Sequence, residues 1–412
     1  MQFGHRCMII LMIVMRLLLV AGLCFGTTIL PVEPHQSTCN HYPPPNFIWE
    51  VPTRKVGAMD KVRIAIVGCG NISQLNVPGY LQHPNCEVIA LCDNAPGRAE
   101  ARAKQWGISP RIYTNYEQVL NDPNVDAVEL LVPQHRHTTM TVDGLDAGKH
   151  VSCQKPMSTS VAEADVMVAA ARRAKTKFRM TENYIYYPPI LKAKELLDSG
   201  AIGEPSLVRF HTVIGGQAEG SVVATDPEAF VWRNDPTLNP LGIVYEDGVH
   251  KFATAMKWIG DIEKVFGIVG KTQEHFMEMP SAFVWKFKGR DCLGMFDYVY
   301  APHMMVRTKY FAGDDYMEIH GSKGSIHVTR CIGELLDFPP VLLIKGTETE
   351  GIEVPSDFIE GFNGAASDFI DSIIEDRQPD LDAEFAKKTI QVAMATYEAA
   401  RTEGPAYPSA MV

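Results

Sequence analysis

From Lys61 onward the chain alternates short apolar runs with longer amphipathic segments. Apolar runs of about four to eight residues are typical of buried strands, whereas longer segments with a repeat near 3.6 residues are typical of helices. We expect strands at residues 62–67, 88–92, 127–132, 150–153 and 178–181. We expect helices between them at residues 71–82, 97–106, 116–120, 137–147 and 161–174. Strands that alternate with helices in this way predict an α/β fold with a doubly wound parallel sheet.

The pattern changes after about residue 182, where short strands with turn residues between them replace the alternation. A helix at residues 190–199 comes first and is closed by Gly200. We expect strands at residues 206–213, 262–269, 282–287, 292–300, 308–311, 316–320 and 325–329. Turns are expected at residues 289–291, 313–315 and 321–324, and final helices at residues 365–375 and 383–401. These elements predict an α+β domain with a large, mainly antiparallel sheet.

Length and this change of pattern predict two folded domains behind a leader. At roughly 150 residues per domain, a chain of 412 residues allows two or three domains. We place the first domain, the doubly wound one, at residues 59–182. The second domain, with the C-terminal helices, takes residues 183–412.

Residues 1–58 fit two interpretations. The apolar stretch from Met8 to Phe25 follows a basic residue and resembles a signal peptide, which implies secretion or a periplasmic location. Arg16 interrupts this stretch, and Met59 stands directly before the first strand. If translation starts near Met59, the leader is not part of the protein and the protein is cytoplasmic. The sequence leaves both interpretations open.

Composition narrows the class of protein. With 46% hydrophobic and 21% charged residues, the chain can bury a large core. Its net charge of −11 and the lack of a basic run argue against a nucleic-acid partner, and we expect no membrane contact for the folded core. The nine cysteines are scattered and form no C-x-x-C pair, so we expect no metal site and a reducing compartment for the folded part.

The first expected strand leads directly into Gly68-Cys69-Gly70-Asn71-Ile72-Ser73, a G-x-G-x-x-S variant of the dinucleotide-binding turn. Asp93 ends the second strand 25 residues after Gly68, near the ~20 residues expected for the acid that binds a ribose. The alternative is a glycine-rich turn with an incidental acid. We expect the pyrophosphate of a dinucleotide to lie on the backbone of Gly68, Gly70, Asn71 and Ile72. Asp93 repels the 2′-phosphate of NADP and favours NAD, although Arg98 nearby leaves NADP possible.

A second informative run, Asp146–Pro156, places Lys155 directly after the strand expected at residues 150–153. The carboxyl ends of parallel strands are where α/β folds bind ligands, and Pro156 favours an extended backbone at Lys155. Taken alone, a lysine in such a loop is more often an ordinary surface residue.

These runs resemble the glucose-fructose oxidoreductase / inositol dehydrogenase / MocA (Gfo/Idh/MocA) family. Residues 148–156 match the family's Gly-Lys-His-Val…Glu-Lys-Pro signature, and Pro133 with His137 matches its Pro-Asn-x-x-His segment. Residues 196–205 match the helix that leads into the family's second domain. The resemblance covers about residues 60–400.

The family's second catalytic element, Asp-x-x-x-His on a helix, is matched by Glu246-Asp247-Gly248-Val249-His250. The i, i+4 spacing would place Glu246 and His250 on one helix face, where the carboxylate orients the imidazole. The resemblance implies that the catalytic residues are Lys155, His250 and Glu246. It implies further cofactor contacts from Pro133, His137, Gln154 and Lys155. It implies substrate contacts from Lys155, Asn183, Tyr187, Asp247 and His250.

Three positions depart from the family's pattern. Gln154 replaces the usual Glu before Lys155, Glu246 replaces the usual Asp, and Ala253 replaces an acid that is common three residues after the His. These changes put the proton relay and the substrate contacts in doubt more than the cofactor site.

The sequence therefore predicts a NAD(P)-dependent oxidoreductase that moves a hydride between nicotinamide and a secondary alcohol of a sugar, an inositol or a related polyol. An NAD-dependent redox-assisted glycosidase is one alternative. A non-catalytic dinucleotide-binding or regulatory protein is another, and Gln154 is the feature that keeps it open. An exposed face of the second sheet would favour a homodimer or homotetramer.

Overall fold

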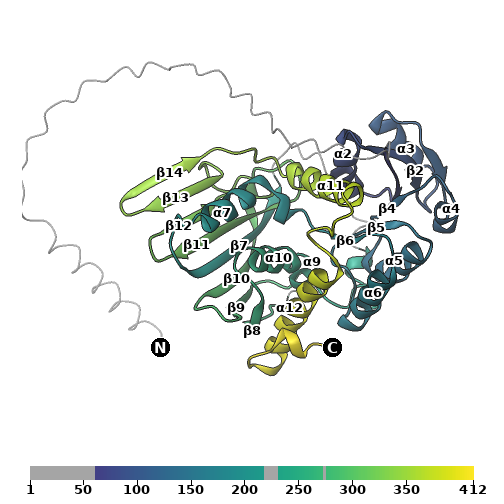
Figure 1. Ribbon diagram of the computed structural model, residues 1–412. Coiled ribbons are helices and arrows are strands. Elements are labelled where there is room, and N and C mark those ends of the chain that lie inside the picture. Colours follow the sequence, from purple (N-terminus) through teal and green to yellow (C-terminus); the bar gives the residue numbers. More distant parts are fainter. Residues whose placement is uncertain (1–60, 218–230, 272–274) are drawn as a thin grey trace, which may run out of the picture. The chain divides into compact units, whose positions relative to one another are not determined.

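The computed structural model describes residues 61–217, 231–271 and 275–412 (Figure 1). The leader and the alternative start at Met59 lie outside the described residues. In the described part of the chain, no helix has the length and apolar character that crossing a membrane requires. The cysteines of this part are all free and buried.

The first lobe is built on six parallel strands in the order β3-β2-β1-β4-β5-β6. The strands are β1 (Val62–Val67), β2 (Cys86–Cys92), β3 (Arg111–Tyr113), β4 (Ala127–Leu130), β5 (His150–Gln154) and β6 (Phe178–Thr181). The helices between them are α2 (Ser73–Gln82), α3 (Arg98–Trp106), α4 (Tyr116–Leu120), η1 (Gln134–Arg136), α5 (His137–Asp146) and α6 (Val161–Arg173). The strand order reverses between β1 and β4, and the carboxyl ends at such a reversal form the usual ligand crevice of α/β folds. The predicted doubly wound parallel sheet is confirmed.

Burial on both faces explains why the apolar runs of this lobe form strands. Val62, Ile64 and Ile66 of β1 are fully buried, and so are Ala65 and its neighbours in β4. The sequence missed β3 because its three residues, Arg-Ile-Tyr, are exposed or half-buried and form no apolar run.

A helix from the far end of the chain completes the core of the first lobe. Helix α11 (Ile359–Ile374) packs against α2, and the two lie side by side in Figure 1. A Cβ on Gly79 of α2 would lie 2.7 Å from the Cβ of Ala366, so only glycine allows this approach. Phe369 and Ile370 join the same buried cluster as β1. The core of the first lobe thus includes a helix from the region that the sequence assigned to the second domain.

The second lobe is built on eight strands in the order β14-β13-β12-β11-β7-β10-β9-β8. All neighbours are antiparallel except β7 and β10, which pair in parallel. The strands are β7 (Pro205–Gln217), β8 (Ile262–Ile268), β9 (Ser281–Phe287), β10 (Leu293–Val306), β11 (Gly313–Gly321), β12 (Gly324–Val328), β13 (Val341–Lys345) and β14 (Glu348–Ile352). The predicted mainly antiparallel sheet is confirmed.

Helices cover one face of this second sheet. They are η2 (Tyr184–Tyr186), α7 (Pro188–Asp198), α9 (Ile243–Glu246), α10 (Gly248–Trp258) and α12 (Ala383–Thr402), and a last short helix is η3 (Pro408–Ala410). Trp258 of α10 stacks on Phe210 of β7 with ring centroids 5.7 Å apart, which anchors α10 to the centre of the sheet. This anchoring fixes the helix that bears His250.

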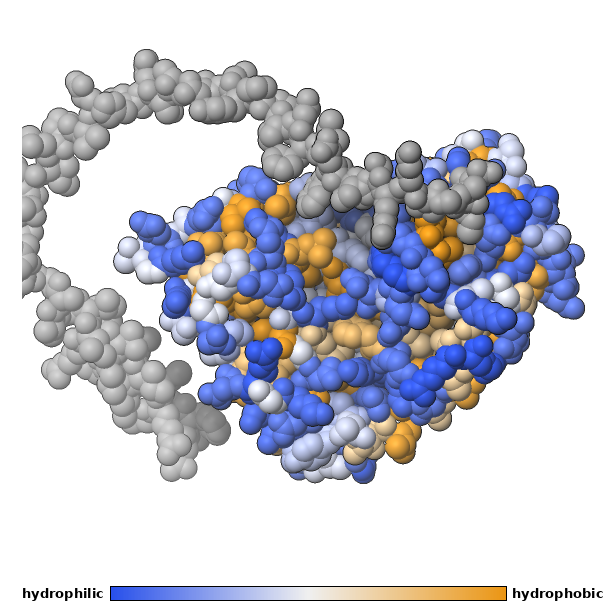
Figure 2. Space-filling view, in the orientation of Figure 1, coloured by the Kyte–Doolittle hydropathy of each residue, from blue (hydrophilic) through white to orange (hydrophobic). Residues whose placement is uncertain are grey.

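The opposite face of the sheet carries no helix among the described residues, and apolar side chains are exposed there. In β9 the burial alternates residue by residue, with Phe283 and Trp285 buried and Val284 exposed. Phe266 and Ile268 of β8 are exposed on the neighbouring strand. On the side of the molecule drawn in Figure 2, hydrophobic residues form separate patches on a mainly hydrophilic surface.

Two local predictions for the second lobe were wrong. Residues 308–311 form no strand, because the Thr308 hydroxyl accepts the Tyr310 amide at 2.9 Å and bends the segment. Residues 313–315 form the start of β11 rather than a turn. The Asp314 carboxylate accepts hydrogen bonds from the backbone amides of Cys331, Gly333 and Leu335 at 2.9 to 3.1 Å. An acid at this position therefore holds the loop at residues 331–335 against β11.

Candidate active site

The glycine turn lies between β1 and α2, where the sequence predicts the dinucleotide site. Gly68 has a φ of +98°, and a Cβ there would lie 2.3 Å from the carbonyl oxygen of Leu131. Glycine alone tolerates both conditions. No described atom lies within 4 Å of where a Cβ of Gly70 would be, so the backbone is open to close approach by a ligand. This geometry fits the pyrophosphate of a dinucleotide.

Asp93 at the end of β2 connects to this turn. Its carboxylate accepts the amides of Cys69 and Ala95, each at 2.8 Å, and the Arg98 guanidinium lies 3.7 Å away. Arg102, which the sequence analysis did not select, donates to the Cys69 carbonyl at 3.1 Å. Asp93 therefore holds the turn as well as offering an acceptor at the place expected for a ribose.

The side chain of His137, at the start of α5, contacts the backbone of neighbouring segments. Its Nδ1 lies 2.8 Å from the Pro156 carbonyl and its Nε2 lies 2.9 Å from the Val132 carbonyl. Burial lowers the pKa of His137, and a neutral imidazole can donate to only one of the two carbonyls at a time. Both ring nitrogens of His137 face backbone carbonyls, so this side chain holds the segment that follows Lys155. A cofactor contact from His137, as predicted, would have to involve atoms other than these two nitrogens. Pro133 precedes η1 as its N-cap.

Lys155 follows β5 and reaches the second lobe. Its ammonium donates to the Glu246 carbonyl at 2.9 Å, and its amide donates to the Gln154 side chain at 2.9 Å. Burial lowers the pKa of Lys155, while Glu246 and Asp247 oppose that shift. The Gln154 Nε2 is buried and has no hydrogen-bond partner among the described residues, so one donor beside Lys155 is available to a ligand.

The carboxylate of Glu246 does not orient His250, contrary to the expectation from the i, i+4 spacing. Asp247 separates α9 from α10, so no single helix carries both residues. Arg233 instead holds this carboxylate, with its Nε 2.9 and 3.0 Å from the two oxygens. Burial would raise the pKa of Glu246, but the charges of Arg233 and Lys155 outweigh it and lower this pKa. Glu246 therefore contacts Lys155 through its carbonyl and Arg233 through its carboxylate.

His250 has a partner from the first lobe. Its Nδ1 is hydrogen-bonded to Oε2 of Glu182, which follows β6 and is fully buried. The ring of Tyr184 stacks on the imidazole with centroids 4.2 Å apart and planes 12° from parallel. Burial raises the pKa of Glu182 to about 8 and lowers the pKa of His250 well below its ordinary value.

A second buried ion pair supports the site from α10. Lys251 is fully buried and lies between Asp247, which it contacts directly, and Asp315, at 3.2 Å. The hydroxyl of Tyr184 donates to Asp315 at 2.7 Å, so the ring that stacks on His250 is fixed at its far end. The Lys251 ammonium lowers the pKa of Asp247 despite burial. Tyr298 also donates to Asp247, at the same oxygen, Oδ2, that Lys251 contacts, so two side chains share one oxygen of the carboxylate that the resemblance assigned to substrate.

Two other residues predicted to contact substrate have different surroundings. Tyr187 is fully buried and its hydroxyl donates to the Ser356 carbonyl at 2.8 Å, so this tyrosine packs the second lobe. Asn183 lies against α11, where a Cβ of Gly361 would be 3.4 Å from its Nδ2. That Nδ2 is buried and has no partner among the described residues.

Sequence reasoning gave no role in this cluster to Glu182, Arg233, Lys251, Tyr298 and Asp315. Glu182 stands at the end of a predicted strand, beside Asn183, and its place at the sheet edge is the signal that could have found it. Lys251 follows Asp247 by four residues, and this i, i+4 spacing is a signal that could have found it. Arg233 offered no such signal, because its partner Glu246 lies 13 residues further along the chain.

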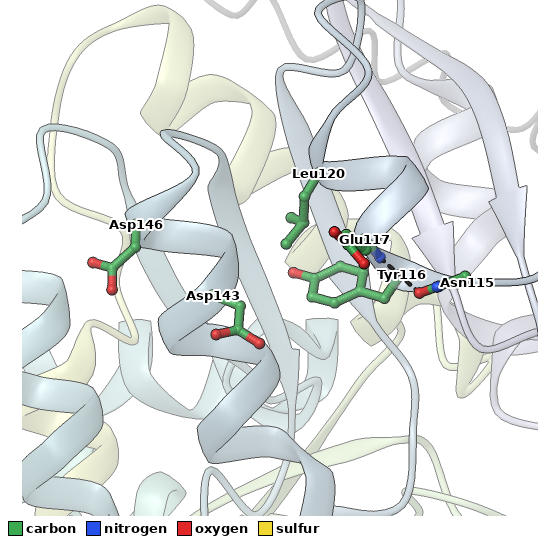
Figure 3. Close-up of a pocket in the computed structure, with 6 residues that line it drawn as sticks. All are labelled: Asn115, Tyr116, Glu117, Leu120, Asp143 and Asp146. Carbon is green, nitrogen blue, oxygen red and sulfur yellow. Dashed lines mark hydrogen bonds between the residues drawn. The ribbon is translucent and has the colours of Figure 1, made fainter.

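A surface depression of about 480 Å³ lies elsewhere, along α4 and α5 (Figure 3). It is lined by Asn115, Tyr116, Glu117, Leu120, Asp143 and Asp146. None of the predicted site residues line it, and its carboxylates would repel an anionic dinucleotide. The depression is therefore not the candidate active site.

Comparisons with known proteins agree with this geometry. A family model described as an oxidoreductase family with a NAD-binding Rossmann fold matches residues 62–182. The model of the GFO/IDH/MocA C-terminal domain matches residues 190–327. Together the two models span more than half of the chain.

Individual proteins give the same result. An uncharacterized oxidoreductase of Rhizobium meliloti is 30% identical over 51% of this chain, and the match spans only 60% of that protein. The myo-inositol 2-dehydrogenase of Thermotoga maritima is 25% identical over 64% of this chain and 74% of its own. An oxidoreductase from Agrobacterium radiobacter, solved with NAD+, L-tartaric acid and magnesium, superposes with a TM-score of 0.73 at 19% identity, over 85% of this chain and all of that one. The chain belongs to the Gfo/Idh/MocA family of oxidoreductases, and its first lobe is the NAD-binding Rossmann domain of that family.

Proposed function

We propose that this protein is a NAD-dependent dehydrogenase that oxidises, and in reverse reduces, a secondary alcohol carbon of a sugar, an inositol or a related polyol. The observation that carries the proposal is the convergence of two side chains from different lobes. Lys155 reaches from the end of β5 to the Glu246 carbonyl, and His250 is held from α10 by Glu182. Lys155 also contributes to lowering the pKa of His250, which supports their closeness.

Each side chain has a distinct role in this proposal. The Lys155 ammonium donates a hydrogen bond to the reacting oxygen and stabilises the negative charge that develops on it. Its lowered pKa makes it a stronger donor than an exposed lysine. The Nε2 of His250 exchanges the hydroxyl proton, because burial keeps the imidazole neutral and a neutral imidazole has one ring nitrogen free to accept a proton. A dinucleotide held by its pyrophosphate at the glycine turn would supply the hydride acceptor or donor through its nicotinamide.

The residues that would hold the cofactor are those of the glycine turn with Asp93, Gln154 and Lys155. An acid at Asp93, already bonded to the turn, disfavours a 2′-phosphate, so we propose NAD rather than NADP. Arg98 lies 3.7 Å from Asp93 and is the residue that could bind the 2′-phosphate of NADP.

The substrate class is proposed from chemistry and from the names of relatives. The T. maritima relative is a myo-inositol 2-dehydrogenase, an enzyme of a cyclic polyol. The buried donors of Gln154 and Asn183, which have no described partner, suit hydroxyl groups of a ribose or a polyol.

We also propose that the protein is a homodimer or homotetramer assembled through the open face of the second sheet. Exposed Phe266, Ile268 and Val284 on adjacent strands support this, since such a surface is commonly covered by a second copy. Light scattering coupled to size-exclusion chromatography tests it. A monomer at micromolar concentration contradicts the proposal.

The test of the main proposal is an absorbance screen at 340 nm with NAD and NADP over sugars, uronates and inositols. We expect NADH formation with at least one polyol, and none with the His250→Gln protein under the same conditions. NAD binding without a signal across the panel would favour the non-catalytic alternative. Release of aglycone from a nitrophenyl glycoside without net NADH would favour the redox-assisted glycosidase.

A further inference from the structure

The pair formed by His250 and Glu182 has a geometry that restricts where its protons can be. Glu182 is fully buried, and its two carboxylate oxygens have different partners. Oε1 accepts the backbone amide of Tyr184 at 2.6 Å, and Oε2 faces Nδ1 of His250. The Tyr184 amide can only donate, so a proton bound to Glu182 has to lie on Oε2, toward the imidazole.

The position of that proton selects the tautomer of His250. When Glu182 is ionised, Nδ1 of His250 carries the hydrogen and donates it to Oε2, which leaves a lone pair on Nε2. When Glu182 is protonated, Oε2 donates to Nδ1, and the imidazole hydrogen lies on Nε2. The first state can accept a proton at Nε2, and the second can donate one.

Building on the proposed function, we propose that Glu182 is the final store of the substrate proton, and that His250 passes the proton to it without becoming a stable imidazolium. During oxidation the hydroxyl proton moves to Nε2 while the Nδ1 proton moves to Oε2 of Glu182. The hydride leaves the same carbon for the nicotinamide, so NAD+ is reduced and the alcohol becomes a carbonyl. Glu182 acts through His250 and is in that sense a positioning residue.

Burial is the physical reason for this direction of transfer. In serine proteases the carboxylate stays ionised and the imidazole takes the charge. Here the carboxylate has one amide donor besides the imidazole, and both groups are withdrawn from water, so a neutral acid beside a neutral imidazole is favoured over an ion pair. The directions of both pKa shifts agree, since burial raises the pKa of Glu182 to about 8 and lowers that of His250.

The charged groups around His250 and Glu182 are balanced in number, so their net charge is close to zero. Groups that face the pair come from every neighbouring element: Lys155 after β5, Tyr184 in η2, Arg233, Glu246 in α9, Asp247 between α9 and α10, Lys251 in α10, Tyr298 in β10 and Asp315 in β11. Three of these are cations and three are carboxylates, each cation beside a carboxylate.

The variant Glu182→Gln separates this relay from a purely structural role. The Tyr184 amide needs an acceptor, so the amide oxygen of the introduced glutamine takes that place and its NH2 group donates to Nδ1. The imidazole is then held in the same orientation but is fixed with its hydrogen on Nε2. A structural role predicts nearly normal turnover in this protein, whereas the relay predicts a loss of at least 100-fold in oxidation.

The first test reads the tautomer directly and needs neither cofactor nor substrate. Two-dimensional NMR of the full chain with 15N-labelled histidine distinguishes the two tautomers, and the signal absent in His250→Gln identifies the residue. We expect Nε2–H at pH 6 and Nδ1–H above pH 9 in the natural protein, and Nε2–H throughout in Glu182→Gln. A tautomer that does not change with pH in the natural protein overturns the proposal, as does a normal titration in the variant.

The second test is the pH profile of kcat/KM for oxidation, with a polyol found in the screen. Oxidation needs ionised Glu182, so the profile should rise with pH up to about 8, and this limb should be absent in Glu182→Gln and return in Glu182→Asp. NADH affinity should stay within threefold of normal in both variants. An unchanged limb in Glu182→Gln overturns the relay.

The matched control is Glu129→Gln. Glu129 in β4 is equally buried and accepts the Tyr80 and Thr181 hydroxyls, but it has no contact with His250. This variant should keep the limb at the same pH, whatever its effect on stability. A failed polyol screen would count against the proposed function only, because the NMR test still decides the relay.

Discussion

The two ends of the site are made in different ways. At the dinucleotide end, the geometry belongs to a short piece of backbone: Gly68, Gly70 and the start of α2, fastened by Asp93 at 2.8 Å. At the reacting end, the geometry belongs to side chains that follow β5 and β6 or come from η2, α9, α10 and β11, joined by contacts that span up to 131 residues, for Tyr184 and Asp315. One end depends on local conformation and the other on tertiary packing.

That difference predicts which property each end controls. A backbone turn binds whatever carries a pyrophosphate and contributes affinity. A cluster of buried charges sets proton positions and contributes turnover. Mutations at the two ends should therefore separate affinity from rate, and the following experiments are ordered from the largest expected effect to the smallest.

Lys155→Met should give the largest effect. It removes the donor to the reacting oxygen, so kcat should fall by roughly 10²- to 10³-fold, while NADH affinity by fluorescence titration stays nearly normal. Lys149→Met is the matched control, because the Lys149 ammonium also donates to backbone carbonyls, of Asp122 and Val125, at 2.9 and 2.8 Å. That control should lower the melting temperature and spare kcat. Normal turnover in Lys155→Met contradicts its role.

Gly68→Ala should weaken the dinucleotide end. The added Cβ meets the Leu131 carbonyl at 2.3 Å and φ is +98°, so the turn must move, and we expect the NADH dissociation constant to rise more than tenfold. Gly97→Ala is the control: its φ is also positive, at +77°, but no described atom lies within 4 Å of the added Cβ. The control should cost about 1 kcal/mol of stability without a change in affinity. Equal affinity losses in both variants would show that the close approach to Leu131 is unimportant.

Glu246→Gln separates the sequence expectation from the structure. If Glu246 oriented His250, its loss would move the pH profile and reduce kcat as strongly as Glu182→Gln does. In the structure the His250 imidazole is bonded to Glu182, and the Glu246 carboxylate is bonded to Arg233. The backbone carbonyl of residue 246, which accepts the Lys155 ammonium, is unchanged by the substitution. We expect a loss of about tenfold in kcat/KM from the weakened Arg233 contact, with the pH limb in place. A pH profile that is displaced in Glu246→Gln would instead support the expectation that Glu246 orients His250.

Asp314→Asn should have the smallest effect and should act on stability alone. The Asp314 carboxylate accepts several backbone amides of residues 331–335, and an amide side chain would place an NH2 group against some of them. We expect a loss of roughly 1–3 kcal/mol in the free energy of unfolding, read from urea denaturation. The pair Arg172 and Glu384 is an exposed reference, and removing it should cost less than about 1 kcal/mol. Equal losses of unfolding free energy in the two proteins would mean that the buried Asp314 carboxylate stabilises the fold no more than an exposed ion pair does.

The same contrast explains what could be predicted from the sequence. The alternating pattern located β1 and β6 to the residue, and the glycine turn with Asp93 was readable because its partners lie within one βαβ unit. The strands β3 and β14 were missed because their residues are mostly exposed and form no apolar run. The strand β13 was also missed, although Val341–Lys345 is a short apolar run with alternating burial.

At the reacting end, the residue types could be read from the chain but their partners could not. The spacing of Glu246 and His250 assumed one unbroken helix, and the break at Asp247 turned the two side chains to different neighbours. Glu182 could have been noticed after the end of β6 and Lys251 from its i, i+4 spacing to Asp247, whereas no spacing rule connects Arg233 to Glu246. Tyr187 has the residue type of a hydroxyl ligand, and only tertiary packing shows that its own hydroxyl is taken by Ser356.

The central claim is that Lys155 and His250 act on one oxygen above the same nicotinamide. The most direct measurement is a crystal structure with NADH and a polyol that gives a signal in the screen. The claim predicts that the Lys155 Nζ and the His250 Nε2 both lie within hydrogen-bond reach, about 2.6–3.2 Å, of the same substrate oxygen. A complex in which either nitrogen lies beyond about 5 Å, with no water between, would contradict it.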